Sequence, residues 1–142
     1  MRGQLDMVTL LLGVGADPDA KTANGSTLLH DAALKGHRDI VQLLLSRGAQ
    51  PNSRNAAGAT ALHDAALGGH VAVIELLLDR GAEINAHDAE TGATPLHQAA
   101  SWGRCPAVEL LLRRGADRNA RNKAGKTPAE ISEGCADQFR VQ

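Results

Sequence analysis

A six-residue phrase recurs four times along this 142-residue chain at a nearly constant period. Every copy begins with glycine and has threonine third, and three copies end in Leu-His. The four glycines are spaced 33, 34 and 33 residues apart. A period of this size indicates stacked structural repeats rather than one globular core. The copies are Gly25–His30, Gly58–His63, Gly92–His97 and Gly125–Glu130.

A second phrase, a leucine triplet followed by Gly-Ala, recurs in step with the first. Together the two phrases predict two short helices in each repeat, such as residues 28–35 and 38–46. Thr27 is placed to cap the first helix, and Gly36 to end it. Neither helix is long enough to be stable alone, so each needs the next repeat to cover its apolar face. The second phrase is found at Leu10–Ala16, Leu43–Ala49, Leu76–Ala82 and Leu110–Ala116.

Proline and loop length agree with this division. Pro95 and Pro128 stand where first helices should begin, and Pro106 stands where a second helix should begin. Proline is best tolerated at the first position of a helix, so all three are expected to open helices. The third repeat is one residue longer, and the extra residue falls in the loop at 87–91, where insertions cost little.

Residues 92–100 contain the full phrase Thr-Pro-Leu-His-x-Ala, and in this the chain resembles the ankyrin-repeat family. The Gly-His pairs and the leucine triplets fit the same pattern. The resemblance implies an all-α repeat protein, a solenoid of stacked helix–turn–helix units with β-turn or hairpin loops. We expect a single domain over residues 1–142. Its parts are a half repeat at 1–21, repeats at 22–54, 55–88 and 89–121, and a partial repeat at 122–142.

The first sixteen residues align with the second half of a repeat only. This predicts either that the sequence belongs to a longer repeat protein or that it is naturally short. In the second case the uncovered N-terminal helix would be a surface for self-association, because terminal repeats normally carry a polar outer face.

The histidines repeat with the same period, which favours a structural role. His30, His63 and His97 occupy one position of the repeat, and we expect each ring to hydrogen-bond backbone in the neighbouring layer. A zinc site would need three or four converging ligands, and short spacings such as His-x₃-His do not occur. Sequence motifs of nucleophilic, phosphate-binding and metal-dependent enzymes are also missing, and a nucleophile–base pair of Cys105 with His97 is disfavoured. No enzyme activity, cofactor, metal or catalytic residue is therefore predicted.

Net charge, hydropathy and the cysteine pattern bear on the cellular location of the protein. The net charge is −1, and no apolar run approaches the roughly 20 residues that cross a bilayer. Cys105 and Cys135 lie far apart without a Cys-x-x-Cys motif, which favours a reduced pair. We expect an intracellular protein, cytoplasmic or nuclear. With few aromatic residues, nucleic acid is not an expected partner, and neither is direct membrane insertion.

The ankyrin resemblance implies that a protein or peptide docks on the loop tips and on the exposed, concave face of the first helices. Trp102 is the leading candidate as an interface anchor, since buried aromatic anchors dominate many interfaces. The other interpretation is that its ring only covers neighbouring side chains. The candidate contacts on the helix face are Asp31, Leu34, Lys35, Asp64, Leu67, Gln98, Ser101 and Trp102. On the tips they are Arg54, Glu90, Arg121, Lys123 and Lys126.

Charge suggests the partner's chemistry. Residues 101–127 hold seven basic and two acidic side chains, whereas residues 17–100 hold six basic and ten acidic ones. An acidic segment bound near the last two repeats would match this excess of positive charge. The alternative is that arginines such as Arg113 and Arg114 face solvent on the convex side.

The sequence thus predicts a non-catalytic interaction scaffold or adaptor. The alternative is the regulatory or substrate-targeting module of a larger enzyme, such as a ligase adaptor or a kinase, with catalysis elsewhere. A third hypothesis, also implied by the resemblance, is modification: Asn85 and Asn119 each have an acidic residue two positions before and leucine eight before, and loop asparagines of the family can be hydroxylated.

Overall fold

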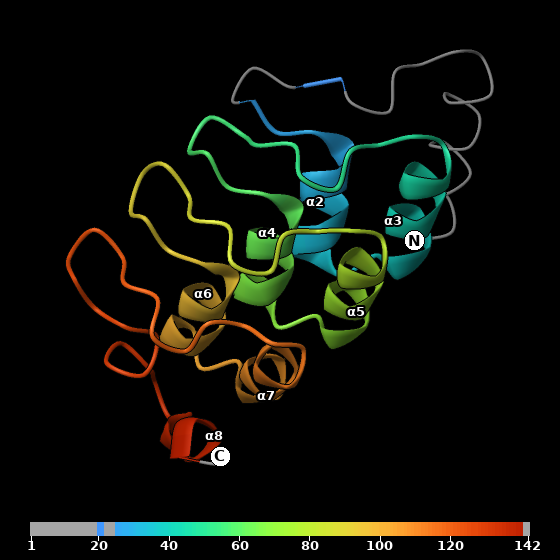
Figure 1. Cartoon of the computed structure of the whole chain (residues 1–142). Helices are drawn as coiled ribbons and strands as arrows, with labels where there is room; N and C mark the ends of the chain where they lie inside the picture. The colour runs from blue at the N-terminus through green and yellow to red at the C-terminus, as the bar shows by residue number, and fades with distance from the viewer. Residues whose placement is uncertain (1–19, 22–24, 141–142) are drawn as a thin grey trace.

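The protein is a stack of helix pairs joined by projecting loops (Figure 1). The computed structural model describes residues 20–21 and 25–140. First helices form one row of the stack and second helices form the other (Figure 1). The first row is α2 (Leu28–Lys35), α4 (Ala61–Gly68) and α6 (Pro95–Ser101), the second row is α3 (Arg38–Ser46), α5 (Val71–Asp79) and α7 (Cys105–Arg113), and the short α8 (Ala136–Arg140) follows.

The first helices begin and end where the sequence predicts. Thr27 has extended backbone and its hydroxyl accepts a hydrogen bond from the His30 N–H, which caps α2. Gly36 ends the helix in the left-handed conformation, with φ of 76°. Leu29, Ala32 and Ala33 are buried, and their equivalents in α4 and α6 are buried too. Small alanine side chains let neighbouring first helices approach closely, which makes this row the tight seam of the stack.

The second helices supply most of the larger core side chains. In α3 the buried residues are Ile40, Val41 and Leu44, and α5 and α7 bury the same positions. Residues at the start of the second helices also link the layers. The His70 ring nitrogen Nε2 bonds the Leu34 carbonyl at 2.8 Å, and Arg104 Nε donates to the Leu67 carbonyl at 2.9 Å. Each layer is therefore fastened to the one before it through both rows.

The loops share one internal design. The loops at 55–59, 88–93 and 122–126 are each closed by a backbone bond across the neck, as from the Asn55 N–H to the Ala59 carbonyl at 2.9 Å. The Asn55 side-chain oxygen also accepts two backbone N–H groups of the loop, at 3.0 Å each. Asp88 takes this place in the loop that is one residue longer, and accepts from the Thr91 and Gly92 N–H groups at 2.6 and 2.9 Å. Loop tips are joined to one another by backbone bonds, such as Lys123 N–H to the Thr91 carbonyl at 2.9 Å.

The last repeat departs from the predicted pattern. Pro128 was expected to open a helix, and this expectation is wrong: residues 128–131 form turns. The reason lies one residue later, where Ala129 stands in place of the buried leucine and is exposed. Without that apolar anchor a short helix has nothing to stabilise it. The predicted N-terminal half repeat lies outside the described residues.

The cysteines also correct a prediction. Cys105 and Cys135 were expected to be a reduced pair, but they form a disulfide with a Cα–Cα distance of 5.2 Å. The bond joins the first residue of α7 to the segment just before α8, and Cys135 is fully buried. Separately, none of the helices in the described residues is long and apolar enough to cross a membrane.

Candidate functional site

The three periodic histidines are committed to holding layers together. Nε2 of His30, His63 and His97 lies 2.9, 2.8 and 2.8 Å from a carbonyl oxygen of the next layer. Their Nδ1 atoms accept the N–H of the capping threonine at 3.3, 3.1 and 3.1 Å. Since Nδ1 accepts, Nε2 must carry the proton and donate, so each ring is neutral.

Burial favours this neutral state. It lowers the pKa of His30, His63 and His97 below 6.5, against the opposing effect of the carbonyl that each ring bonds. Both nitrogens of each ring are occupied by bonds within the protein. In the described part of the chain, no group of three or more His, Cys, Asp or Glu side chains is placed to hold a metal ion. A nucleophile–base pair of Cys105 with His97 is ruled out in this state, because the Cys105 sulfur is bonded to Cys135.

The exposed side of α2, α4 and α6, which we call the first-helix face, carries most of the predicted contact residues. Leu34 is 41% exposed and Trp102 is 57% exposed, although both are large and apolar. Leu67 and Gln98 are half-buried on the same face. The face also includes Asp31, Lys35, Asp64 and Ser101.

Trp102 stands where α6 ends. Its backbone N–H donates to the Gln98 carbonyl at 3.2 Å, and Gly103 follows in the left-handed conformation with φ of 68°. Gly103 also lies close to the terminal segment, because a Cβ added to it would lie 3.0 Å from the Glu133 carbonyl oxygen. Backbone on both sides therefore fixes the position of Trp102, while more than half of its surface stays open to solvent. This exposure favours the interface-anchor interpretation over local packing.

Two aspartates occupy the same position in successive layers of the first-helix face. Asp31 is exposed, whereas Asp64 is half-buried between the neighbouring layers. Burial, with the Asp31 carboxylate adding to it, raises the pKa of Asp64 to about 7. Near neutral pH Asp64 therefore binds a proton far more readily than an exposed aspartate does. Sequence position identified these residues as contacts, but nothing in the pattern showed that the two charges oppose each other.

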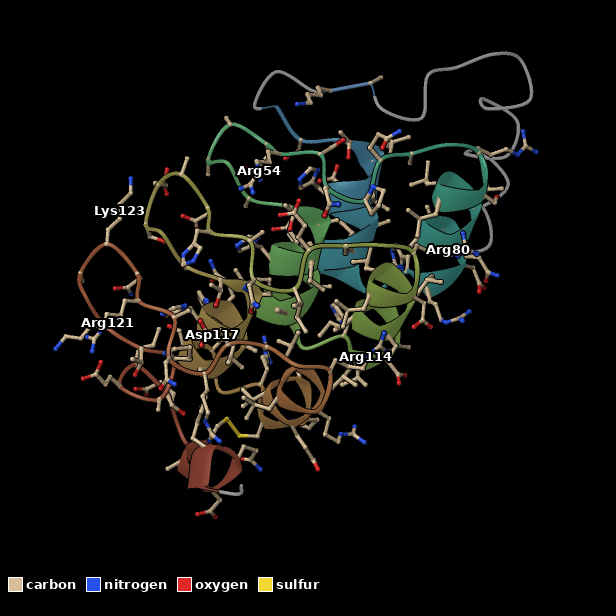
Figure 2. The ribbon with its side chains drawn as sticks, viewed as in Figure 1. Arg54, Arg80, Arg114, Asp117, Arg121 and Lys123 are labelled. Carbon is tan, nitrogen blue, oxygen red and sulfur yellow. A yellow bond between two sulfur atoms is a disulfide. The ribbon has the colours of Figure 1, made fainter. Side chains whose placement is uncertain are left out.

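The basic side chains of the loop tips serve partly as braces. Arg54 donates to the Gly58 carbonyl of its own loop at 2.7 Å and to the His87 carbonyl of the next at 2.8 Å. Arg121 donates to the Gly125 carbonyl at 2.8 Å, and the Lys123 amine donates to the Ala89 carbonyl. Figure 2 shows these three side chains on the projecting loops. Glu90 and Lys126 are exposed tip residues of the same region.

The arginines of the other side behave as the alternative interpretation expects. Arg113 and Arg114 are exposed on the second row. Arg114, which is labelled in Figure 2, forms an ion pair with Asp79 at 2.9 Å, and this pair joins two layers at the surface. Part of the positive charge counted in residues 101–127 therefore lies away from the first-helix face.

The two asparagines proposed for modification are exposed but engaged. The Asn85 side-chain oxygen accepts the Asp117 N–H of the next layer at 2.8 Å. Asn52 makes the corresponding link one layer earlier, to Glu83 N–H at 2.8 Å. The Asn119 N–H donates to the Asp117 carboxylate at 2.9 Å. For Asn85, modification of the side chain would have to accommodate this bond between layers.

Sequence reasoning missed the disulfide. In the repeat register Cys135 occupies the place of Trp102 one layer later, and Cys105 is the first residue of α7. Their approach is a contact between layers, which the period of a single sequence does not show.

A comparison with protein families gives a clear result. A family model described as ankyrin repeats (3 copies) matches residues 1–88 and 55–122, which together cover most of the chain. No curated protein matches the chain.

Proposed function

Because the chain belongs to the ankyrin-repeat family, we propose that its first-helix face and loop tips bind a protein or peptide. Ankyrin repeats are generally protein–protein interaction modules. The observation that carries the proposal is the exposure of Trp102, at 57%, on a face where Leu34 is also exposed. Ankyrin-repeat domains are typically non-catalytic, and we propose a scaffold or adaptor role for this chain.

The rigidity of the stack supports this role. Buried side chains, inter-layer bonds from histidine rings and bonds between loop tips hold the contact residues at fixed spacing. A partner therefore meets a surface that is already ordered, and little conformational entropy is lost on binding. Trp102 would fill a hydrophobic pocket of the partner, with Leu34 and Leu67 extending the apolar contact.

The partner proposed for the last two repeats is an acidic segment. Arg121, Lys123 and Lys126 are exposed on one loop, which follows the layer that contains α6 and Trp102. Arg121 and Lys123 already donate to carbonyl groups, but a guanidinium and an ammonium each have further N–H groups to offer. The carboxylates of an acidic segment would accept hydrogen bonds from those remaining N–H groups.

An intracellular location, cytoplasmic or nuclear, also stays a prediction.

The experiment is a binding comparison of Trp102→Ala with the unaltered protein, using partners captured by affinity purification. Loss of Trp102 should weaken binding at least about tenfold, as expected for an interface anchor. Arg80→Ala is the matched control, because Arg80 is exposed beside the second row (Figure 2). Circular dichroism should show that both variants remain folded. Equal binding by Trp102→Ala and the unaltered protein would remove Trp102 from the site.

A further inference from the structure

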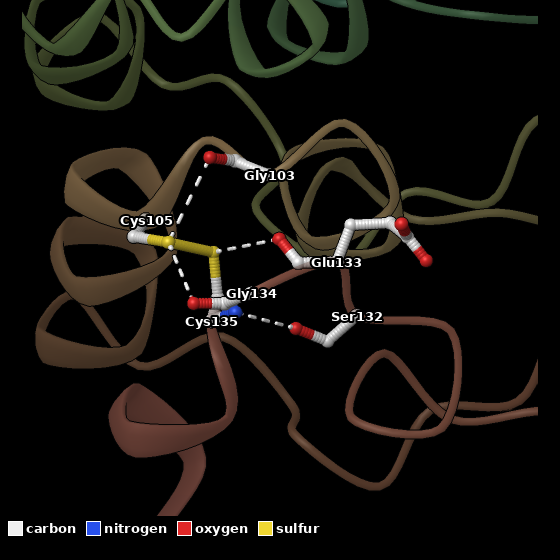
Figure 3. The surroundings of a disulfide bond; sticks show 6 residues. All are labelled: Gly103, Cys105, Ser132, Glu133, Gly134 and Cys135. Carbon is white, nitrogen blue, oxygen red and sulfur yellow. Dashed lines mark hydrogen bonds between the residues drawn. A yellow bond between two sulfur atoms is a disulfide. The ribbon is translucent and has the colours of Figure 1, made fainter.

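The Cys105–Cys135 disulfide fastens the last described segment to the stack (Figure 3). Cys105 is the first residue of α7 and is partly exposed, whereas Cys135 has no exposed surface. Cys135 also belongs to the apolar core, with the side chains of α6 and α7. The bond therefore joins a partly exposed residue to one that has no exposed surface.

The segment that carries Cys135 packs directly against the site proposed above. The Glu133 N–H donates to the Ala100 carbonyl of α6 at 2.9 Å. The Glu133 carbonyl faces Gly103, near enough that a Cβ there would lie 3.0 Å away. These two contacts lie on either side of Trp102 in the sequence. The position of the segment is thus coupled to the end of α6 on which Trp102 stands.

The other attachments of the segment are non-covalent. Residues 128–131 are turns, and α8 has five residues where the preceding second helices have nine. A cavity of about 540 Å³ lies between α7 and α8, lined in part by Leu112, Ala116 and Gln138. Phe139 is half-buried against the core, and the Arg118 guanidinium donates to its carbonyl. A helix of five residues is too short to be stable on its own, and the disulfide adds a covalent link to these contacts.

Reduction of this disulfide has a defined course. A thiolate of a dithiol reductant attacks the Cys105 sulfur, because Cys135 is inaccessible; the S–S bond breaks and the Cys135 sulfur leaves with the electron pair and takes a proton. The reductant's second thiolate then displaces Cys105, which is also protonated. The products are two cysteine thiols and an oxidised, disulfide form of the reductant.

The surroundings of the sulfurs permit both states. The Cys105 sulfur lies 3.5 Å from the Gly134 carbonyl oxygen and 3.7 Å from that of Gly103, and the Cys135 sulfur lies 3.8 Å from that of Glu133 (Figure 3). A disulfide sulfur has no proton to donate, but a thiol would find these acceptors in place. During the exchange, however, a buried Cys135 thiolate is costly until it is protonated, which favours movement of the segment into solvent.

From these contacts we infer that the Cys105–Cys135 pair is a redox switch for the Trp102 site. With the disulfide formed, residues 128–140 stay docked and hold the end of α6 in its binding geometry. Reduction releases the segment and weakens partner binding. Only the statement about binding rests on the proposed function; release of the segment is a property of the free protein.

The first test uses the free protein, oxidised with glutathione disulfide and then reduced with dithiothreitol, with free thiols titrated in each state. Amide exchange at Glu133 should become at least about tenfold faster on reduction, while exchange in α4 stays unchanged. Trp102 is the chain's single tryptophan, so acrylamide quenching of its fluorescence should rise on reduction. A double variant, Cys105→Ser with Cys135→Ser, should resemble the reduced protein and not respond to dithiothreitol.

Three outcomes would overturn the switch: no disulfide forms under the oxidant, exchange at Glu133 does not change on reduction, or dithiothreitol changes the double-serine variant equally. The second test measures the affinity of a captured partner for both redox states, with reduction expected to lower it at least about tenfold. If the segment is released but affinity is unchanged, the control of binding is wrong while the conformational switch stands. If Trp102→Ala also leaves affinity unchanged, it is the proposed function that fails.

Discussion

The third repeat and the segment that follows it receive similar loops but reach different structures. Asn122 builds its loop as Asn55 does, with its side-chain oxygen accepting the N–H groups of Ala124 and Lys126 at 2.9 and 3.0 Å. After that loop, however, α6 has no helical counterpart, and turns take its place. Local hydrogen bonding is therefore enough to shape a loop, whereas a short helix needs an apolar anchor as well.

The histidine position shows what the terminal segment lacks. In α6, His97 accepts the Thr94 N–H through Nδ1 and reaches the next layer through Nε2. Glu130 takes the same place, and its carboxylate accepts the Thr127 N–H at 2.8 Å. That bond lowers the pKa of Glu130, but an ionised carboxylate has no proton to donate to another layer. Glu130 therefore keeps the bond to the capping threonine but not the bond between layers, and a disulfide attaches the segment instead.

The largest effect should come from the core of the middle layers. Leu62 is fully buried in α4, and Leu62→Ala should lower the free energy of unfolding by about 4 kcal/mol, through lost burial and a new cavity. Ala129→Gly, at the matching position of the terminal segment, should cost under about 1 kcal/mol because Ala129 is exposed. Urea unfolding of both variants measures the contrast, and similar losses would contradict it.

Loss of the disulfide should be the next largest effect. The two cysteines are 30 residues apart, and opening a loop of this size should lower the free energy of unfolding by about 3 kcal/mol. Urea unfolding with and without dithiothreitol measures this, with the double-serine variant as the control. An unchanged midpoint would mean that the terminal segment holds itself in place without the bond.

A substitution on the first-helix face should stabilise the protein. The pKa of Asp64 is about 7 when folded and near 3.8 when unfolded, so the folded protein binds the extra proton and loses stability as pH rises between these values. Asp64→Asn should therefore raise the free energy of unfolding at pH 8 by about 1 to 2 kcal/mol. The gain should shrink toward pH 4, where Asp64 is protonated in the folded protein. Asp31→Asn, at the exposed equivalent position, should produce a smaller gain.

The smallest predicted effect is a difference in pH dependence between the first helices and the terminal segment. The pKa values of His30, His63 and His97 are lowered on folding, so the unfolded chain takes up protons more readily and stability declines as pH falls below 6.5. The lowered pKa of Glu130 acts in a lower window, with stability lost only as pH falls below 4.5. Amide exchange should show lower protection of the backbone amides of α2, α4 and α6 at pH 5.5 than at pH 7.5. An equal loss of amide protection in residues 127–133 over the same pH interval would contradict the predicted difference between the two regions.

The sequence predicted the repeats well because the period reflects local chemistry. Threonine before each first helix, glycine after it, and leucine or alanine at buried positions act within a few residues of one another. The helix expected after Pro128 did not form, since a helix start signal has no effect without the leucine that Ala129 replaces.

The candidate site was predictable in position but not in its interactions. Exposure of Trp102 and Leu34 followed from their places in the repeat. The bracing bonds of Arg54 and Lys123, the raised pKa of Asp64 and the disulfide arise between layers. A single sequence does not show which side chains meet across layers, because long side chains such as arginine can reach several carbonyls from one position.

The proposed binding surface is tested most directly by a residue-resolved footprint of a captured partner, measured as amide-exchange protection on the unaltered, oxidised protein. If the first-helix face binds the partner, protection should appear at the end of α6 around Trp102, on the exposed side of α2 and α4, and at the loop tips, with α3, α5 and α7 unchanged. Protection concentrated on the second row, with the first-helix face unaffected, would contradict it.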